Sequence, residues 1–397
     1  MALFVFVATY YFPENPNEAI SKLKEKGILL AAVILNHNFK SIVEIRSNFI
    51  EKKVKVLLVP GHEPDYGGSE YRGLIERDMN VELAQDLQEF FKNNSHYQVF
   101  ISRDEKDWSP FFQSYFKEDW SEIVKWTNTS IKEFSRLVAI GSTTKPASKV
   151  IHNKAPANVS YRLFGITKWS NENNVDVVIH IHFNDNPRYY TRGPGKYSGF
   201  AIYVPTAQFD NSTTTKAIAS RIYKRLAKYD PVSNLPGESS GIIDEPDLIA
   251  VGANNTSDAA SLLIEYSYIY EPQFQDAKLR QMAIKDLAFQ TYLGIQDFFG
   301  QNAYINLTRA YDTSILPYDW GSDITDESSR SDIYALQTAL TFDHEYPPEG
   351  KSKNECPRTG RLGPCTLSAL ETFQEKYGIV GEDGFAGPKT IKDLNNL

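Results

Sequence analysis

The sequence predicts an α/β protein with a mostly parallel sheet and helices on both faces, followed by a small all-α C-terminal domain. Short runs rich in Val, Ile and Leu alternate along the chain with segments of helical period. The run 175–183 has no helical period and is dense in β-branched residues, which is typical of a central strand buried on both faces. After residue 330 only short helical segments follow.

Composition narrows the class of protein. The chain has 397 residues, enough for two or three domains, and is 41% hydrophobic and 23% charged, as in globular proteins with a sizeable core. Its net charge of −8 argues against a nucleic-acid partner, because such proteins show a basic face. The two cysteines, Cys356 and Cys365, are too few for a cysteine-based zinc cluster, so any metal must be held by histidine and carboxylate.

Residues 1–50 are predicted to be an N-terminal leader, either a signal or an anchor. A charge-free run, 27–39, follows the Lys-rich 22–26 and resembles the apolar centre of a signal peptide. It is shorter than the ~18 residues that span a membrane. A strand or short helix packed on the following domain is the alternative, and membrane anchoring stays open.

The catalytic region is expected over residues 51–299. Strands are predicted at 54–59, 97–102, 175–183, 198–204 and 261–266, and helices at 76–93, 159–172, 213–229 and 275–298. In the first helix Leu83, Leu87 and Phe91 recur on one face.

Residues 104–150 interrupt this alternation and are predicted to be a helical insertion. They contain Trp108, Phe111, Phe112, Tyr115, Phe116, Trp120 and Trp126. These aromatic residues are expected to form a small core of their own, and a lid or substrate-contacting surface is the alternative. Residues 300–329, with acidic residues among Ser, Gly and Pro, are predicted to be a linker, and 330–397 a separate helical domain.

Three residues at element ends suit a metal site. His62 follows the first strand, His182 lies at the end of 175–183, and Glu76 opens a helix. In open α/β sheets the carboxyl ends of the strands carry the functional groups. Two imidazoles and one carboxylate are a ligand set of catalytic zinc that leaves a position for water. The sequence therefore predicts zinc on His62, Glu76 and His182.

Glu265 is the predicted catalytic residue. It lies on an apolar strand, where an unpaired charge is costly, and it has no basic neighbour in sequence. A carboxylate beside a metal can take a proton from water and pass it to the leaving group.

Each of these residues has a simpler alternative. Glu76 favours the positive end of its helix in any case, His182 suits a hydrogen-bonded core position, and Glu265 could pair with a distant Arg or Lys. His180 lies on the same side of its strand as His182. Its alternatives are a ligand in place of His182, a residue that supports a ligand and a core residue, and one of the last two is expected.

The order of these motifs resembles that of the zinc-dependent N-acetylmuramoyl-L-alanine amidases. The matching pieces are Pro60-Gly61-His62, Gly73-Leu74-Ile75-Glu76, Ile181-His182-Phe183-Asn184 and Leu263-Ile264-Glu265, over roughly residues 54–299. The resemblance implies zinc on His62, Glu76 and His182 with Glu265 as catalytic glutamate. It also implies hydrolysis of the amide between N-acetylmuramic acid and the L-alanine of the stem peptide.

The chain departs from the family pattern at three places. His180 stands where a serine is usual, Glu63-Pro64 replaces a glycine pair, and Ser267 replaces a glycine. Glu63 is expected either to stiffen the loop or to add a carboxylate near the substrate.

The C-terminal unit resembles the small helical peptidoglycan-binding domain. The resemblance rests on Phe373-Gln374, Tyr377-Gly378, Asp383-Gly384 and Gly387-Pro388. It implies peptidoglycan, both glycan strands and stem peptides, as the partner. Cys356 and Cys365 either close a short disulfide loop or remain thiols.

Together these observations predict a peptidoglycan hydrolase that is exported to the cell envelope or exterior and acts as a monomer without a nucleic-acid partner. A zinc peptidase cutting within the stem peptide, or a non-catalytic wall-binding protein, are the rival interpretations.

Overall fold

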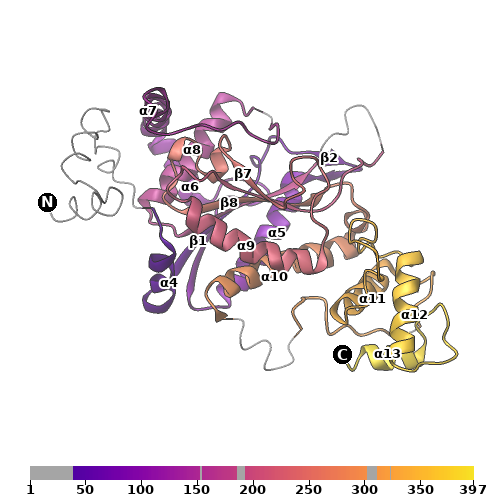
Figure 1. The fold of residues 1–397 in the computed structure, drawn as a ribbon. Helices are drawn as coiled ribbons and strands as arrows, with labels where there is room; N and C mark the ends of the chain where they lie inside the picture. The colour runs from indigo at the N-terminus through magenta and orange to yellow at the C-terminus, as the bar shows by residue number, and fades with distance from the viewer. Residues whose placement is uncertain (1–38, 153, 186–192, 302–310, 322) are drawn as a thin grey trace, which may run out of the picture.

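The computed structural model describes residues 39–152, 154–185, 193–301, 311–321 and 323–397, and Figure 1 shows its arrangement. The six-stranded sheet has the order β4-β1-β5-β8-β6-β7. Its strands are β1 (Val54–Pro60), β4 (Tyr97–Ile101), β5 (Val177–Asn184), β6 (Ala201–Pro205), β7 (Ile242–Glu245) and β8 (Ala260–Tyr268). A small hairpin, β2 (Glu70–Tyr71) with β3 (Leu74–Ile75), lies between β1 and the first catalytic-domain helix.

Four neighbouring strands of this sheet are parallel. β1 pairs with β4 and β5, and β5 pairs with β8, all in parallel. β6 is antiparallel to β8 and parallel to β7, so these two strands run the other way. The predicted α/β class with a mostly parallel sheet is therefore confirmed, with a reversed pair of strands at one edge.

Helices cover both faces of the sheet because the central strands are apolar on both sides. Val56 and Leu58 of β1 share a core with α5 (Glu76–Lys92), α9 (Ser212–Tyr229) and α10 (Ala277–Phe298). Leu57 and Val59, which point to the opposite face, pack in a second core with α6 (Pro110–Glu118) and α8 (Ala157–Glu172). α7 (Trp120–Ala139) packs outside α8 (Figure 1).

The predicted insertion at 104–150 contains α6 and α7, but its aromatic residues do not form a separate core. Phe112 is fully buried against Trp169 of α8 and joins Leu57 and Val178 of the sheet. Trp108, Phe111 and Phe116 pack around the same cluster. The expectation of an independent core was wrong because these aromatic residues share one buried cluster with the sheet and with α8.

Helix α4 (Ile42–Glu51) lies within the stretch predicted as a leader. Its Ile45 and Phe49 are buried in the main core, and Phe49 stacks on Phe299 with ring centroids 4.3 Å apart. This part of the stretch packs on the catalytic domain, whereas residues 1–38, with the signal-like run, lie outside the described residues. Among the described residues, no helix combines the length and apolarity needed to cross a bilayer.

The C-terminal unit is helical, as predicted, with α11 (Arg330–Phe342), α12 (Pro364–Lys376) and α13 (Pro388–Leu394). Gln337 of α11 holds it together, since its amide donates to Arg361 O and Thr366 Oγ1 and accepts from the N–H groups of Thr359 and Gly360. Cys356 and Cys365 are joined in a disulfide, which resolves the alternative left open by the sequence.

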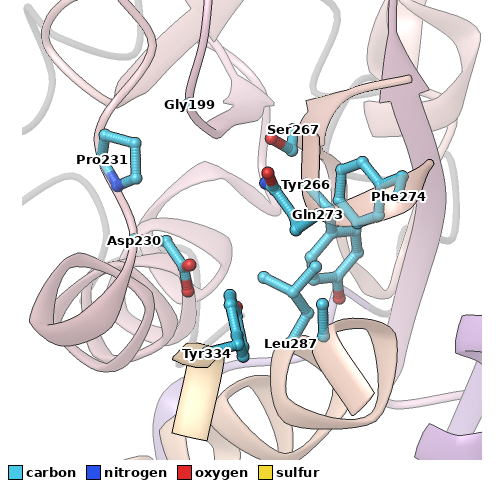
Figure 2. Close-up of a pocket in the computed structure, with 10 residues that line it drawn as sticks. Gly199, Asp230, Pro231, Tyr266, Ser267, Gln273, Phe274, Leu287 and Tyr334 are labelled. Carbon is cyan, nitrogen blue, oxygen red and sulfur yellow. The ribbon is translucent and has the colours of Figure 1, made fainter. Parts of the chain in front are cut away.

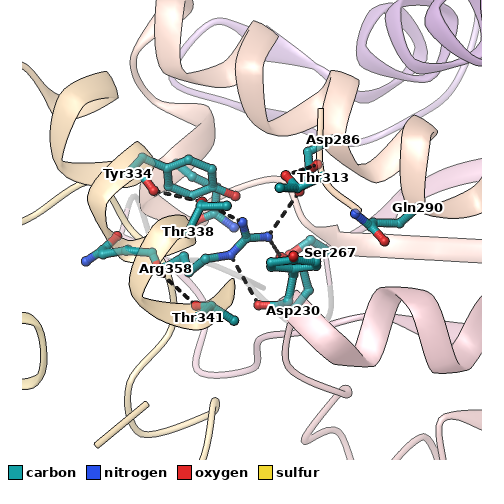
Figure 3. Close-up of polar contacts among 12 residues, drawn as sticks. Asp230, Ser267, Asp286, Gln290, Thr313, Tyr334, Thr338, Thr341 and Arg358 are labelled. Atoms are coloured by element: carbon teal, nitrogen blue, oxygen red, sulfur yellow. Dashed lines mark hydrogen bonds and ion pairs between the residues drawn. The ribbon is translucent and has the colours of Figure 1, made fainter. Parts of the chain in front are cut away.

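The C-terminal unit packs directly on α9 and α10 through Arg358 (Figure 3). The guanidinium of Arg358 lies 3.0 Å from Asp230 and 3.5 Å from Asp286, both in the catalytic domain. Its charged group lies 5.0 Å from the ring centre of Tyr229 and 4.9 Å from that of Tyr334. Residues 311–321 of the predicted linker also pack here, with Ile315, Leu316 and Trp320 buried.

Candidate metal centre

Three predicted ligands come from separate elements at the carboxyl edge of the sheet. His62 follows β1, Glu76 is the first residue of α5, and His182 lies near the end of β5. His62 has φ of 67°, a left-handed conformation that is uncommon outside glycine and turns its side chain toward the sheet edge. The structure thus brings together residues separated by 14 and 106 positions of sequence.

The ligand atoms of these three side chains converge. One atom from each of His62, Glu76 and His182 lies within 4.8 Å of the others. Glu76 Oε1 is 2.8 Å from His62 Nε2 and 3.2 Å from His182 Nδ1. The buried His62 Nε2 has no partner in hydrogen-bonding geometry within the described part of the chain. An unpartnered imidazole nitrogen facing a carboxylate and a second imidazole fits a divalent metal ion.

Glycine leaves the space for these rings. A Cβ on Gly61 would lie 2.2 Å from the His182 ring, so only glycine fits there. Gly68, with φ of +86°, would place a Cβ 3.2 Å from the His62 ring and 3.3 Å from Arg77 N. Gly67-Gly68 therefore lies against the first histidine, although it is displaced in sequence from the position the family pattern gives a glycine pair.

Glu76 is held in its ionised form. Burial alone would raise the pKa of its carboxyl, but the charge of His62 and the close contacts with both histidine rings bring that pKa well below the usual value. Its Oε2 accepts the Ser69 N–H at 2.8 Å and its Oε1 the Phe183 N–H at 3.4 Å. The site therefore offers a fixed anionic ligand.

Glu265 lies beside this group. It is paired in register with His182 on the adjacent strand, so both side chains project from the same face of the sheet. Its Oε2 is buried without a hydrogen-bond partner, and no Arg or Lys among the described residues pairs with it. Burial, together with the charges of Glu76 and Glu238, raises the pKa of Glu265 well above the ordinary value. A carboxyl in this environment binds a proton more readily than an exposed glutamate does.

His180 is not among the converging ligands. It is 2% exposed, and burial followed by the neighbouring His182 lowers its pKa to about 3. The structure places it as a neutral core imidazole two residues before His182.

Two arginines that the sequence did not indicate brace the site. The fully buried Arg103, just after β4, donates to the carbonyl oxygens of Pro60, Gly61 and His62 and to that of Arg77 in α5. Burial lowers its pKa to about 10, so it stays charged at neutral pH. The only feature of the sequence that could have indicated Arg103 is its position at the end of a predicted strand.

The second is Arg162 of α8, which forms a two-bond salt bridge with Glu63. Its Nε and Nη2 lie 2.6 and 2.8 Å from the two carboxylate oxygens. Glu63 is 6% exposed. Its carboxylate therefore fixes the His62 loop to α8, and it is not presented to a substrate.

Glu238 was also missed, since it lies in an irregular Pro-Gly-Glu-Ser segment with no pattern. It is 1% exposed and accepts hydrogen bonds from Tyr203, Tyr268, Ser233 and Asn184. This buried carboxylate contributes to the negative potential at Glu265.

A comparison with known protein families gives one match over more than half of the chain. Residues 56–297 match the family described as N-acetylmuramoyl-L-alanine amidase. No curated protein matches the chain significantly.

Among solved structures, the fold is similar to an N-acetylmuramoyl-L-alanine amidase from Clostridium difficile 630, with 15% identity, a TM-score of 0.39 and coverage of 63% of this chain and 99% of the other. It is also similar to the amidase Ami1 from Mycobacterium smegmatis, with 14% identity and a TM-score of 0.41. The match covers 62% of this chain and 97% of the other. The CwlD amidase from Clostridioides difficile, solved with the GerS lipoprotein, has 16% identity, a TM-score of 0.40 and coverage of 62% and 99%.

Proposed function

Because the chain belongs to the N-acetylmuramoyl-L-alanine amidase family, whose members act on peptidoglycan with the help of a metal, we propose that it is a zinc-dependent amidase. It cleaves the bond between N-acetylmuramic acid and the L-alanine of the stem peptide. The observation that carries this proposal is the convergence of His62, Glu76 and His182 beside the unpartnered carboxyl of Glu265.

Each residue has a distinct part in this mechanism. His62, Glu76 and His182 would hold the ion, which when bound polarises a carbonyl and lowers the pKa of water. The two imidazoles must be neutral to act as ligands, and burial lowers the pKa of His182 in the required direction. Arg103 and the Glu63–Arg162 pair keep the His62 loop in place.

Glu265 moves the proton. Its carboxylate accepts a proton from the attacking water, and the raised pKa lets the resulting carboxylic acid keep that proton until it passes to the leaving nitrogen. The described residues offer no cation that would hold Glu265 as a permanent ion pair. One carboxyl group therefore serves first as base and then as acid.

We further propose that the C-terminal unit binds peptidoglycan and that the protein works as a monomer outside the cytoplasm, in the envelope or beyond it. The remaining rivals are a peptidase acting within the stem peptide and a wall-binding protein without activity. The complete donor set and Glu265 favour a catalyst over the latter.

Purified protein incubated with peptidoglycan and analysed by mass spectrometry tests the proposal. The amidase releases intact stem peptides and peptide-free glycan, whereas a peptidase leaves L-alanine on muramic acid. Chelation should abolish release, and added zinc should restore it. Glu265→Gln should lower kcat by at least about 100-fold, with zinc still bound.

The matched control is Glu89→Gln, which removes an exposed carboxylate from α5 far from the ligand group. Released peptides that lack the N-terminal L-alanine would contradict the assignment. Full activity of Glu265→Gln would contradict it as well.

A further inference from the structure

The C-terminal unit has a cavity of about 370 Å³ at the start of α11. Arg330 and Arg361 line it together with Ile333, Leu362 and Asp326. Two guanidinium groups against one exposed carboxylate leave its wall with a net positive charge. None of its lining residues belongs to the candidate metal centre.

Among the described residues, neither arginine forms a salt bridge. Arg330 donates through Nη2 to Thr359 O at 2.9 Å, but its Nε is buried without a hydrogen-bond partner. Within the described part of the chain, the Arg361 side chain makes no hydrogen bond or ion pair. Burial, and next the charge of Arg361, lower the pKa of Arg330, while Asp276 partly offsets them. Two like charges on one cavity are unfavourable unless an anion lies between them.

The cavity is also pre-shaped. Gly360 has φ of +66°, and a Cβ there would lie 2.5 Å from Arg330 O and 2.7 Å from Leu279 of α10. The segment bearing Arg361 can therefore approach α11 and the catalytic domain closely. Ile333 and Leu362 add apolar wall beside the guanidinium groups. A cavity with cationic and aliphatic walls suits an acid with an aliphatic stem.

The orientation of this cavity relative to the catalytic domain is fixed. Arg358, only two residues before Gly360, is buried between Asp230 and Asp286. A ligand held at Arg361 would thus set where the polymer lies relative to the sheet edge that carries Glu265.

We propose that the Arg330–Arg361 cavity binds a carboxylate of a peptidoglycan stem peptide. This inference rests on the proposed function, because that function supplies the polymer. Stem peptides carry several free carboxylates on short aliphatic side chains, and a guanidinium pair can grip one of them with parallel hydrogen bonds.

Titration of the full-length protein with the free stem tripeptide, L-alanyl-γ-D-glutamyl-diaminopimelic acid, tests it by calorimetry. This peptide is a product of the proposed reaction, so binding is measured without hydrolysis. Arg361→Ala should weaken binding about tenfold, as loss of one charge-assisted contact does. The affinity of Arg361→Lys should lie between that of the parent and that of Arg361→Ala. Lys392→Ala, an exposed cation on α13, is the matched control and should bind like the parent.

A tripeptide with its carboxylates converted to amides should not bind at this cavity. Equal binding of the amidated peptide, or parent-like binding by Arg361→Ala, would overturn the proposal. Tighter binding of inorganic phosphate than of the tripeptide would overturn the choice of a carboxylate. Because the readout is binding alone, a failure here is distinct from a failure to release peptides from peptidoglycan.

Discussion

The loop carrying His62 is held by charged side chains that are not ligands. Arg103 ties its carbonyl oxygens to α5, and the Glu63–Arg162 salt bridge ties it to α8. Because His62 has a left-handed backbone, its conformation depends on such contacts. Replacing a residue that orients a ligand typically lowers metal affinity by about 10-fold to 100-fold.

Arg162→Ala is therefore expected to lower zinc affinity by about 10-fold to 100-fold, because it frees the His62 loop and leaves Glu63 buried without its partner. Competition with a chromogenic chelator measures this. Arg136→Ala is the control, since Arg136 forms a comparable two-bond pair with Glu133 on the exposed side of α7. Unchanged zinc affinity in Arg162→Ala would show that the loop holds His62 without this salt bridge.

Some residues of the candidate metal centre could be predicted from the sequence and others could not, and the difference has a physical reason. His62, Glu76, His182 and Glu265 stand at strand ends, at a helix start or on an apolar strand, and such positions are visible in the local pattern. Arg103 and Glu238 act through partners tens of residues away, as in the bond from Arg103 to His62 O or from Tyr203 to Glu238. Only the folded chain brings these partners together.

At the scale of elements, helix α6 completes one face of the sheet. Phe112 is fully buried in this core and contacts Phe116, Trp169 and Trp108. Phe112→Ala should therefore lower the free energy of unfolding by about 3–5 kcal/mol, from lost burial and a residual cavity. Urea denaturation measures it. The control, Ile140→Ala, removes a side chain that is 43% exposed and should cost less than about 0.5 kcal/mol.

A small effect of Phe112→Ala would mean that the insertion packs independently of the sheet. That result would favour the original expectation of a separate aromatic core.

Helix α13 depends on a carboxylate from outside it. Glu382 accepts the N–H groups of Lys389 and Thr390 and the hydroxyl of Thr390, all at 2.8–2.9 Å. Burial opposes ionisation of this carboxyl, but these hydrogen bonds outweigh it and lower its pKa below the ordinary 4.5. Glu382→Ala should therefore destabilise the C-terminal unit by about 1 kcal/mol near neutral pH.

The pH dependence of this effect follows from the sign of the pKa shift. The folded carboxyl binds its proton less readily than the unfolded one, so its contribution is present above the unfolded pKa and is lost as pH falls through the folded value. The gap between parent and Glu382→Ala in urea denaturation should narrow below about pH 4.5. Glu371→Ala, exposed on α12, is the control. A gap that widens in acid would contradict this assignment.

Strands with a strong local sequence pattern were predicted well, and strands with a weak pattern were not. β5 and β8 are dense in apolar residues and were predicted within a few positions. β7 was missed because it has four residues, two of them acidic, in a Gly- and Ser-rich stretch. The reversed direction of β6 was not predictable, because it results from antiparallel pairing with β8 and not from anything within Ala201–Pro205.

At the scale of the whole molecule, the C-terminal unit is joined to the catalytic domain by a buried charged group. The Arg358 guanidinium is nearly fully buried between Asp230 and Asp286, and it donates to Tyr229 O and Thr338 Oγ1 (Figure 3). Beside it lies a small cavity of about 10 Å³ lined by Asp230, Tyr334 and Ser267, shown in Figure 2. Ser267 is two residues after Glu265, so the interface adjoins the strand that carries the catalytic carboxyl.

Arg358→Ala should separate the unfolding of the two units. The substitution leaves Asp230 and Asp286 buried without their cation, and breaking such a pair costs about 3–5 kcal/mol. Differential scanning calorimetry should then show two transitions where the parent shows one.

Replacing Arg358 by Met together with Asp230→Asn and Asp286→Asn removes all three charges. This triple change should lower the free energy of unfolding less than Arg358→Ala does, since no unpaired ion remains. Lys376→Ala, which breaks an exposed pair with Asp343 and Glu345 in the same unit, should leave one transition. A single transition at the parent temperature in Arg358→Ala would show that apolar packing alone joins the units, and the C-terminal cavity would then keep its orientation without this ion pair.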